Sequence, residues 1–166
     1  MITAVRIIGV GHPSAGDDAV GLVVARRVRA LAHSTVEVFE IVDPSRLIPL
    51  LFTPSPVVIV DAVLGAGAVG HVVVFDAEVP PTGCACQPVS SHGLDVRSAV
   101  GLARLVSTGP MSPRISIVGV TISKPVGFSH GLSGPVEASV ERAALTALEV
   151  ARADSSPAPA QNPTAL

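Results

Sequence analysis

The chain has 166 residues, of which 48% are hydrophobic and 14% are charged, and its formal net charge is −2. This length corresponds to one domain, and the apolar content is sufficient for a packed core, which excludes an intrinsically disordered chain. The chain contains no Trp, no Tyr, four Phe and no run of basic residues. It therefore lacks the stacking side chains and the positive surface on which nucleic-acid binding depends, and we exclude nucleic acid as a partner.

Targeting and membrane segments are not expected either. Residues 1–10 are apolar but lack a basic region and a cleavage site of small residues. The apolar stretch Val57–Ala77 is interrupted by acidic residues, a histidine and glycines, so it is a poor candidate to cross a bilayer. Cys84 and Cys86 are badly spaced for a disulfide. These features predict a soluble, cytoplasmic protein with reduced thiols.

Short runs of β-branched residues alternate with amphipathic segments along the chain. The predicted strands, in chain order, are Val5–Val10, Thr35–Val42, Val57–Val60, His71–Phe75 and Ile115–Val120. The predicted helices are Ala19–Leu31, Arg46–Leu51, Leu94–Leu105 and Pro135–Arg152. This alternation predicts a three-layer α/β fold, with a mostly parallel, twisted sheet of about five strands and helices on both faces. Residues 71–75 follow a glycine-rich turn rather than a helix, which predicts an antiparallel or edge strand.

We expect residues 1–153 to form a single domain. Residues 154–166 are rich in Pro, Ala and Ser and show no periodic apolar face. This composition predicts a disordered C-terminal tail that contributes nothing to the core.

Chemically active side chains occur where predicted strands lead into loops, which is where sites form in open α/β sheets. Asp17 and Asp18 lie between the first strand and the first helix, Asp61 follows the apolar run at residues 57–60, and His92 precedes the third predicted helix. Asp18, Asp61 and His92 would provide two oxygens and one nitrogen. Such a set suits a divalent metal such as zinc or nickel and leaves coordination positions free for a substrate.

Each of these residues also has a structural interpretation. Asp17 or Asp18 could cap the first helix or interact with its dipole, although a cap explains one acid more easily than two. Asp61 could cap the turn after its strand, and His92 could be an ordinary loop histidine. Against this, a carboxylate at the end of a buried strand is costly to desolvate unless it is paired or bound to a metal.

Two other motifs are incomplete. The glycines at residues 9–11 resemble a dinucleotide fingerprint, but Gly16 is misplaced, and acids occupy the helix N-terminus where a pyrophosphate would bind. The segment Gly127–Gly131 matches the nucleophile elbow of serine hydrolases, but the acid and histidine that should follow it are missing.

Five segments of the chain form a pattern together: IIGVG at residues 7–11, GDDAVG at 16–21, VIVDAV at 58–63, SSHGL at 90–94 and GLSGPV at 131–136. In this order and spacing they resemble the hydrogenase maturation protease family, over residues 5 to about 151.

The resemblance implies an endopeptidase that removes the C-terminal extension from the precursor of a nickel-iron hydrogenase large subunit after nickel insertion. By position, it implies that Asp18, Asp61 and His92 bind the nickel, which the precursor presents, and that Asp18 and Asp61 are catalytic. The chain departs from the family at His12, where Asn is usual, and at residues 43–46, where a glycine-rich segment is usual. The identity of the hydrogenase and a ligand role for His12 therefore stay open.

Docking on the nickel of the precursor would hold the scissile peptide beside these residues. Because no activated Ser, Cys or Thr is evident, we expect water to attack the peptide, with either a carboxylate as general base or the metal as Lewis acid. The precursor is the expected partner of a monomeric enzyme.

Two other functions fit part of the pattern. A receiver domain also carries acids after its first and third strands and a lysine after its fifth, here Lys124. However, a loop separates Asp17 and Asp18 from the first strand, and the glycines at residues 65–70 leave no room for the helix of a receiver. The third possibility is a nickel-binding module without enzymatic activity. Such a module would bind free nickel tightly, whereas the protease would bind it weakly.

Overall fold

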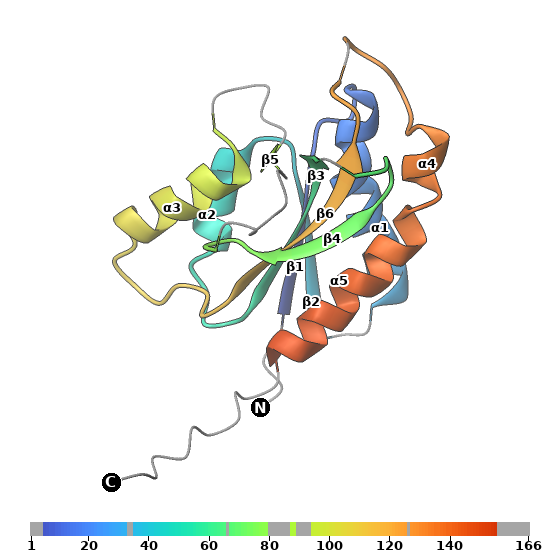
Figure 1. Ribbon diagram of the computed structural model, residues 1–166. Coiled ribbons are helices and arrows are strands. Elements are labelled where there is room, and N and C mark those ends of the chain that lie inside the picture. Colours follow the sequence, from blue (N-terminus) through green and yellow to red (C-terminus); the bar gives the residue numbers. More distant parts are fainter. Residues whose placement is uncertain are drawn as a thin grey trace, which may run out of the picture.

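The computed structural model describes residues 5–32, 35–65, 67–79, 87–88, 94–125 and 127–155. A central sheet separates two groups of helices in a three-layer α/β fold (Figure 1). The strands are β1 (Val5–Val10), β2 (Val36–Ile41), β3 (Val57–Leu64), β4 (Val72–Asp76), β5 (Gln87–Pro88) and β6 (Ile115–Ile122). The helices are α1 (Val20–Leu31), α2 (Leu47–Leu50), α3 (Val96–Val106), α4 (Gly134–Glu137) and α5 (Val140–Ser155), with 3₁₀ turns η1 (Gly16–Ala19) and η2 (Pro44–Arg46).

The strand order is β2-β1-β3-β6-β4, in which β2, β1, β3 and β6 are parallel and β4 is antiparallel to β6. The short strand β5 pairs antiparallel with the end of β3. The predicted fold class is therefore confirmed, and so is the antiparallel pairing of the strand after the glycine-rich turn. The parallel strands all end at one side of the sheet, which we call the C-terminal edge. Sites in such folds form there.

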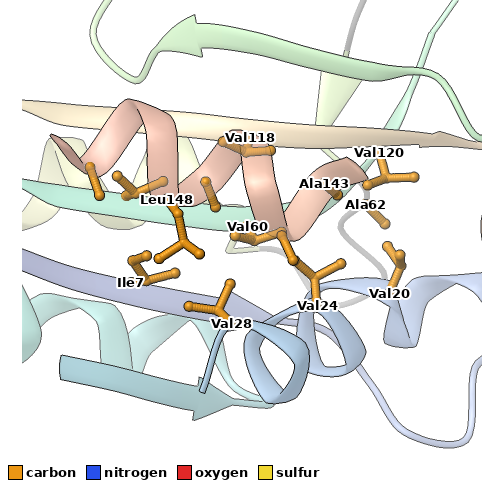
Figure 2. Packing of buried hydrophobic residues seen from close by; sticks show 14 of the residues in the cluster. Ile7, Val20, Val24, Val28, Val60, Ala62, Val118, Val120, Ala143 and Leu148 are labelled. Atoms are coloured by element: carbon orange, nitrogen blue, oxygen red, sulfur yellow. The ribbon is translucent and has the colours of Figure 1, made fainter. Parts of the chain in front are cut away.

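Two apolar cores lie on opposite faces of the sheet. In the first, α1 and α5 pack on β1, β3 and β6, and Val24 and Val28 of α1 face Ile7 and Val60 of the sheet (Figure 2). The second core lies under α2 and α3. Because β3 and β6 are covered on both faces, their sequences are almost continuously apolar. None of the described helices is long and apolar enough to span a membrane.

Two element boundaries differ from the prediction. β3 continues to Leu64 because its register with β6 persists along its whole length, so Asp61 lies inside the strand and not after it. The last predicted helix is divided into α4 and α5. The division occurs at Ser139, whose hydroxyl donates a hydrogen bond to the Val136 carbonyl at 2.7 Å and so takes part in a turn.

The C-terminal limit of the domain also differs. Helix α5 extends to Ser155, so Asp154 and Ser155 belong to the domain and not to a tail that begins at residue 154. The hydroxyl of Ser155 donates to the carbonyl of Ala151 at 2.7 Å. Residues 156–166 lie outside the described residues, and the expected disorder of the tail stays a prediction.

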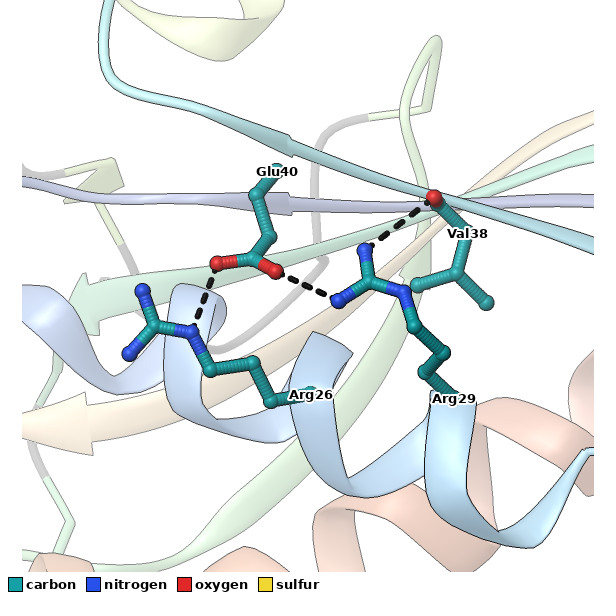
Figure 3. A network of polar contacts seen from close by, with 4 residues as sticks. All are labelled: Arg26, Arg29, Val38 and Glu40. Atoms are coloured by element: carbon teal, nitrogen blue, oxygen red, sulfur yellow. Dashed lines mark hydrogen bonds and ion pairs between the residues drawn. The ribbon is translucent and has the colours of Figure 1, made fainter.

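The edge strand β2 is covered by charged side chains that pair with α1. Glu40 accepts hydrogen bonds from Arg26 and Arg29, both at 2.7 Å, and Arg29 also donates to the Val38 carbonyl (Figure 3). Burial raises the pKa of Glu40, but the hydrogen bonds and charges of Arg29 and Arg26 outweigh burial and hold that pKa below its ordinary value. Charged side chains at a sheet edge discourage pairing with another chain.

Candidate functional site

Two glycines hold the loop that carries Asp17 and Asp18 against the sheet. A Cβ atom added at Gly9 would lie 2.2 Å from the carbonyl oxygen of Gly21, and one added at Gly21 would lie 2.1 Å from that of Val10. Only residues without a Cβ therefore allow α1 to rest directly on the backbone of β1. This contact places the start of α1, and the acids just before it, at the C-terminal edge.

The two adjacent acids have different partners. Asp17 accepts hydrogen bonds from the backbone N–H and the hydroxyl of Ser133, at 2.6 and 2.8 Å, and so ties the start of α4 to the start of α1. Asp18 accepts a hydrogen bond from the backbone N–H of His12 at 3.0 Å. Neither acid caps the turn in which it lies, because the N-cap residue is Ala15 and no side chain bonds there. The capping interpretation is therefore wrong, and Asp17 instead joins two distant segments.

Asp61 is buried inside β3, beside the turn that carries Asp18. The residue is 4% exposed, and its Oδ1 accepts a hydrogen bond from the backbone N–H of Ala62 at 2.9 Å. Burial raises the pKa of Asp61 well above its ordinary value, and the negative charges of Asp18 and Asp95 raise it further, whereas the bond from Ala62 lowers it. The structure thus brings Asp18 and Asp61 together. A buried acid near other acids is unfavourable for folding and typical of a functional site.

Asp95 is a third acid near this site, and sequence reasoning missed it. It is the N-cap of α3 and accepts a hydrogen bond from the backbone N–H of Ser98 at 2.7 Å. The predicted helix began at Leu94, which hid this role. An aspartate directly before the apolar periodicity that starts at Val96 was the signal that could have identified the cap.

His92 lies outside the described residues, so its place in the proposed ligand set stays a prediction. Within the described ranges, no group of three His, Cys, Asp or Glu side chains is arranged to hold a metal. The predicted set of Asp18, Asp61 and His92 extends beyond those ranges. Its two described members are carboxylates that repel each other, and a cation between them would relieve that repulsion.

His12 is placed beside Asp18 but contributes its backbone rather than its ring. Its Nδ1 accepts a hydrogen bond from the backbone N–H of Ser14 at 3.3 Å. A neutral imidazole whose Nδ1 is an acceptor carries its proton on Nε2. In this arrangement neither ring nitrogen presents a free lone pair, which argues against His12 as a fourth metal ligand.

A pocket of about 380 Å³ opens next to Asp17. Residues 15–17 form one side, and residues of the segment between β6 and α4, including Lys124 and His130, form the other. In Figure 1 this orange segment arches above the ends of the strands. Sequence reasoning did not foresee the pocket, because its two sides are more than a hundred residues apart along the chain and meet only in the fold.

Comparison with protein families identifies a match over most of the chain. The model of the hydrogenase maturation protease family, HycI, matches residues 28–150, which is well over half of the chain. The matched range includes Asp61 and His92 but begins after Asp18. No curated protein sequence is significantly similar to the chain.

Several solved structures share the fold. The hydrogenase maturating endopeptidase HybD from E. coli has a TM-score of 0.71 at 24% identity, with 90% of this chain and 93% of that chain covered. The solution structure of an endopeptidase from Escherichia coli has a TM-score of 0.74 at 23% identity, with coverages of 90% and 93%. The maturation protease HycI from Thermococcus kodakarensis KOD1 has a TM-score of 0.61 at 24% identity, with coverages of 90% and 91%.

These comparisons give no support to a receiver domain or to a non-enzymatic nickel module. The structures confirm the fold, and the family match extends over most of the domain, including the strand that carries Asp61. The chain therefore belongs to the hydrogenase maturation protease family, a family of peptidases.

Proposed function

We propose that this protein removes the C-terminal extension from the nickel-loaded precursor of a nickel-iron hydrogenase large subunit, acting as a monomer in the cytoplasm. In this proposal nickel belongs to the substrate, and Asp18, Asp61 and His92 bind it when the precursor docks. Membership of the family supports a peptidase of hydrogenase maturation. The nickel contact and the roles of the three residues are our inference.

The observation that carries the proposal is the environment of Asp61. Its carboxylate is buried at the C-terminal edge, and its charged form is opposed by burial and by the charge of Asp18. An incoming cation would convert this repulsion into attraction, so the pair is prepared to accept a metal brought by another molecule. Asp95 lies three residues after His92 in sequence and acts on Asp61 electrostatically, which supports His92 as the third ligand.

The same carboxylates can serve the hydrolysis. A water molecule attacks the scissile carbonyl carbon, and a carboxylate of the pair Asp18 and Asp61 takes its proton. Burial and the charge of Asp18 raise the pKa of Asp61 above its ordinary value, which makes its carboxylate a stronger base than that of an ordinary aspartate. The proton then passes to the leaving nitrogen as the C–N bond breaks. The extension leaves with a free amino group, and the large subunit keeps a new C-terminal carboxylate.

The test uses the full chain with the large-subunit precursor from the same cell, prepared with and without nickel. Mass spectrometry of the large subunit is expected to show loss of the extension only when the precursor carries nickel. Absence of processing by the wild-type protein would contradict the proposed activity. Equal processing of both precursors would contradict nickel docking alone.

Replacement of His92 distinguishes a ligand from a proton carrier. His92→Gln is expected to weaken binding of the nickel-loaded precursor, because an amide is a weaker ligand than an imidazole, and to leave the apo-precursor unbound. His71→Gln, which changes an exposed histidine outside the proposed set, is the control. If His92→Gln bound the loaded precursor as well as the wild type and failed only in cleavage, His92 would be a catalytic base.

A further inference from the structure

The pocket beside Asp17 has walls that are fixed relative to the candidate site. The backbone N–H of Gly16 donates to the carbonyl of Ser129 at 2.8 Å, and the N–H of Ser129 donates to the carbonyl of Ser14 at 3.1 Å. The two hydrogen bonds between Asp17 and Ser133 close the other end. Through Ser129 and Ser133, the segment between β6 and α4 is therefore attached to three residues of the loop that carries Asp17 and Asp18. A molecule held in this pocket would therefore have a fixed position relative to Asp18.

The charge in the pocket is provided by a lysine without a counter-ion. Lys124, the only lysine of the chain, is exposed and lines the pocket together with His130. It forms no ion pair with the described part of the chain. The one acid of the lining, Asp17, already accepts hydrogen bonds from Ser133 on both of its oxygens. The pocket thus presents an exposed cation that is available to pair with an anionic group of another molecule.

We infer that this pocket binds a carboxylate carried by the C-terminal extension of the precursor, with Lys124 as its counter-ion. The inference rests on the proposed function. The metal-bearing part of the precursor would occupy the side of Asp18 and Asp61, so the chain beyond the scissile bond continues toward the neighbouring pocket. A volume of about 380 Å³ accommodates a short peptide segment rather than a folded domain.

An exposed aromatic side chain supports a protein segment as the occupant. Phe128 is 89% exposed, and it lies between Gly127 and Ser129, which both line the pocket. Phe128 itself does not line the pocket, but an exposed aromatic side chain on the same segment provides the contact area by which protein partners are commonly anchored. A small inorganic anion would make no use of it. The combination fits a peptide with one carboxylate and an adjacent apolar side chain.

The experiment measures the processing of the nickel-loaded precursor by full-length variants and separates KM from kcat. We expect Lys124→Met to raise KM about fivefold and Lys124→Glu to raise it about tenfold, because the first removes an exposed attraction and the second adds repulsion. The turnover number is expected to stay unchanged, and Lys124→Arg should retain the KM of the wild type. Higher ionic strength should narrow the difference between Lys124→Glu and the wild type.

Two controls make the outcome specific. Arg46→Met removes an exposed cation that does not line the pocket and is expected to leave KM unchanged. A synthetic peptide with the sequence of the extension should inhibit the wild type, and the same peptide with its carboxylates converted to amides should inhibit it less. Normal processing with an unchanged KM in Lys124→Glu would overturn the pocket assignment and leave the proposed function intact. Absence of processing by the wild type would overturn both.

Discussion

Two buried aspartates lie at opposite edges of the same sheet. Asp154, near the end of α5, has a side chain that is 2% exposed, and it forms an ion pair with Arg114 and accepts a hydrogen bond from the hydroxyl of Ser116, both at 2.8 Å. Asp61 is similarly buried in β3, but the charged groups that act on it are the acids Asp18 and Asp95.

The difference shows how one residue type serves two purposes. A cation and a hydroxyl compensate Asp154 for the loss of water, so its carboxylate joins α5 to the start of β6. Asp61 has one backbone hydrogen bond and two like charges, so its ionisation opposes folding. A protein keeps such an unfavourable charge where another molecule completes its environment. The proposed site therefore lies at the edge with Asp61, whereas Asp154 joins structural elements at the opposite edge.

The largest effect expected is on activity. Asp61→Asn should lower kcat/KM for the nickel-loaded precursor by at least about a hundredfold, because an amide neither takes a proton nor binds a metal as a carboxylate does. The amide oxygen can still accept the hydrogen bond from Ala62. Asp76→Asn, an exposed acid at the opposite edge, is the matched control and should process normally. Comparable activity of Asp61→Asn and the wild type would remove Asp61 from the site.

The stability of the same variant should change in the opposite direction. The native pKa of Asp61 lies above the unfolded value of about 4, so the native state binds the proton more tightly and wild-type stability falls as pH rises between the two pKa values. Asp61→Asn removes this fall and should raise Tm at pH 7, with a smaller gain at pH 4. Thermal unfolding of the variant and the wild type at pH 7 and pH 4 measures the two differences in Tm. A lower Tm at pH 7 would mean that the carboxylate stabilises the fold.

Asp154→Ala should show the reverse pattern. We expect a loss of about 1–2 kcal/mol in the free energy of unfolding, because the hydroxyl of Ser116 loses its acceptor while Arg114 stays solvated. That loss corresponds to a fall in Tm of about 2–8 °C. Processing of the precursor at a temperature well below Tm should be unchanged. An unaltered Tm would show that the ion pair and the hydrogen bond contribute nothing.

Truncation provides the smallest expected change. Residues 156–166 contain three prolines and no charge, so a chain ending at Ser155 should match the wild type in Tm and in processing. A chain ending at Ala153 also lacks Asp154 and should lose about as much stability as Asp154→Ala. Equal Tm values for the two truncations would mean that the end of α5 does not contribute.

The sequence predicted the fold well because its periodicities are local. The spacing of Val20, Val24 and Val28 predicts α1, and the unbroken apolar run at residues 57–60 predicts a strand covered on both faces. The antiparallel strand followed from the absence of a helix between residues 65 and 70. The end of β3 was missed because continued pairing with β6 overrides the expected stop at Asp61.

The sequence predicted less of the site, because its contacts are long-range. That Asp18 and Asp61 lie together followed from the rule that parallel strands end at one edge. The bonds between Asp17 and Ser133 join residues 116 positions apart, and no local pattern signals them. Likewise, the partners of Asp154 are 38 and 40 positions away along the chain, so no local pattern signals them. The Pro, Ala and Ser content of residues 154–166 predicts a tail instead.

The contact between Gly9 and Gly21 determines how precisely the acids are placed. Elsewhere helices rest on sheets through side chains, whose rotamers can adjust when a neighbour changes size. At Gly9 and Gly21, α1 lies directly against the backbone of β1, and a Cβ at Gly21 would also lie 2.5 Å from the carbonyl oxygen of Val60, so no side chain of these two residues separates the helix from the sheet. The position of Asp18 relative to Asp61 is consequently a property of the main chain, and substitutions deeper in the core can alter stability without altering the separation of the two carboxylates.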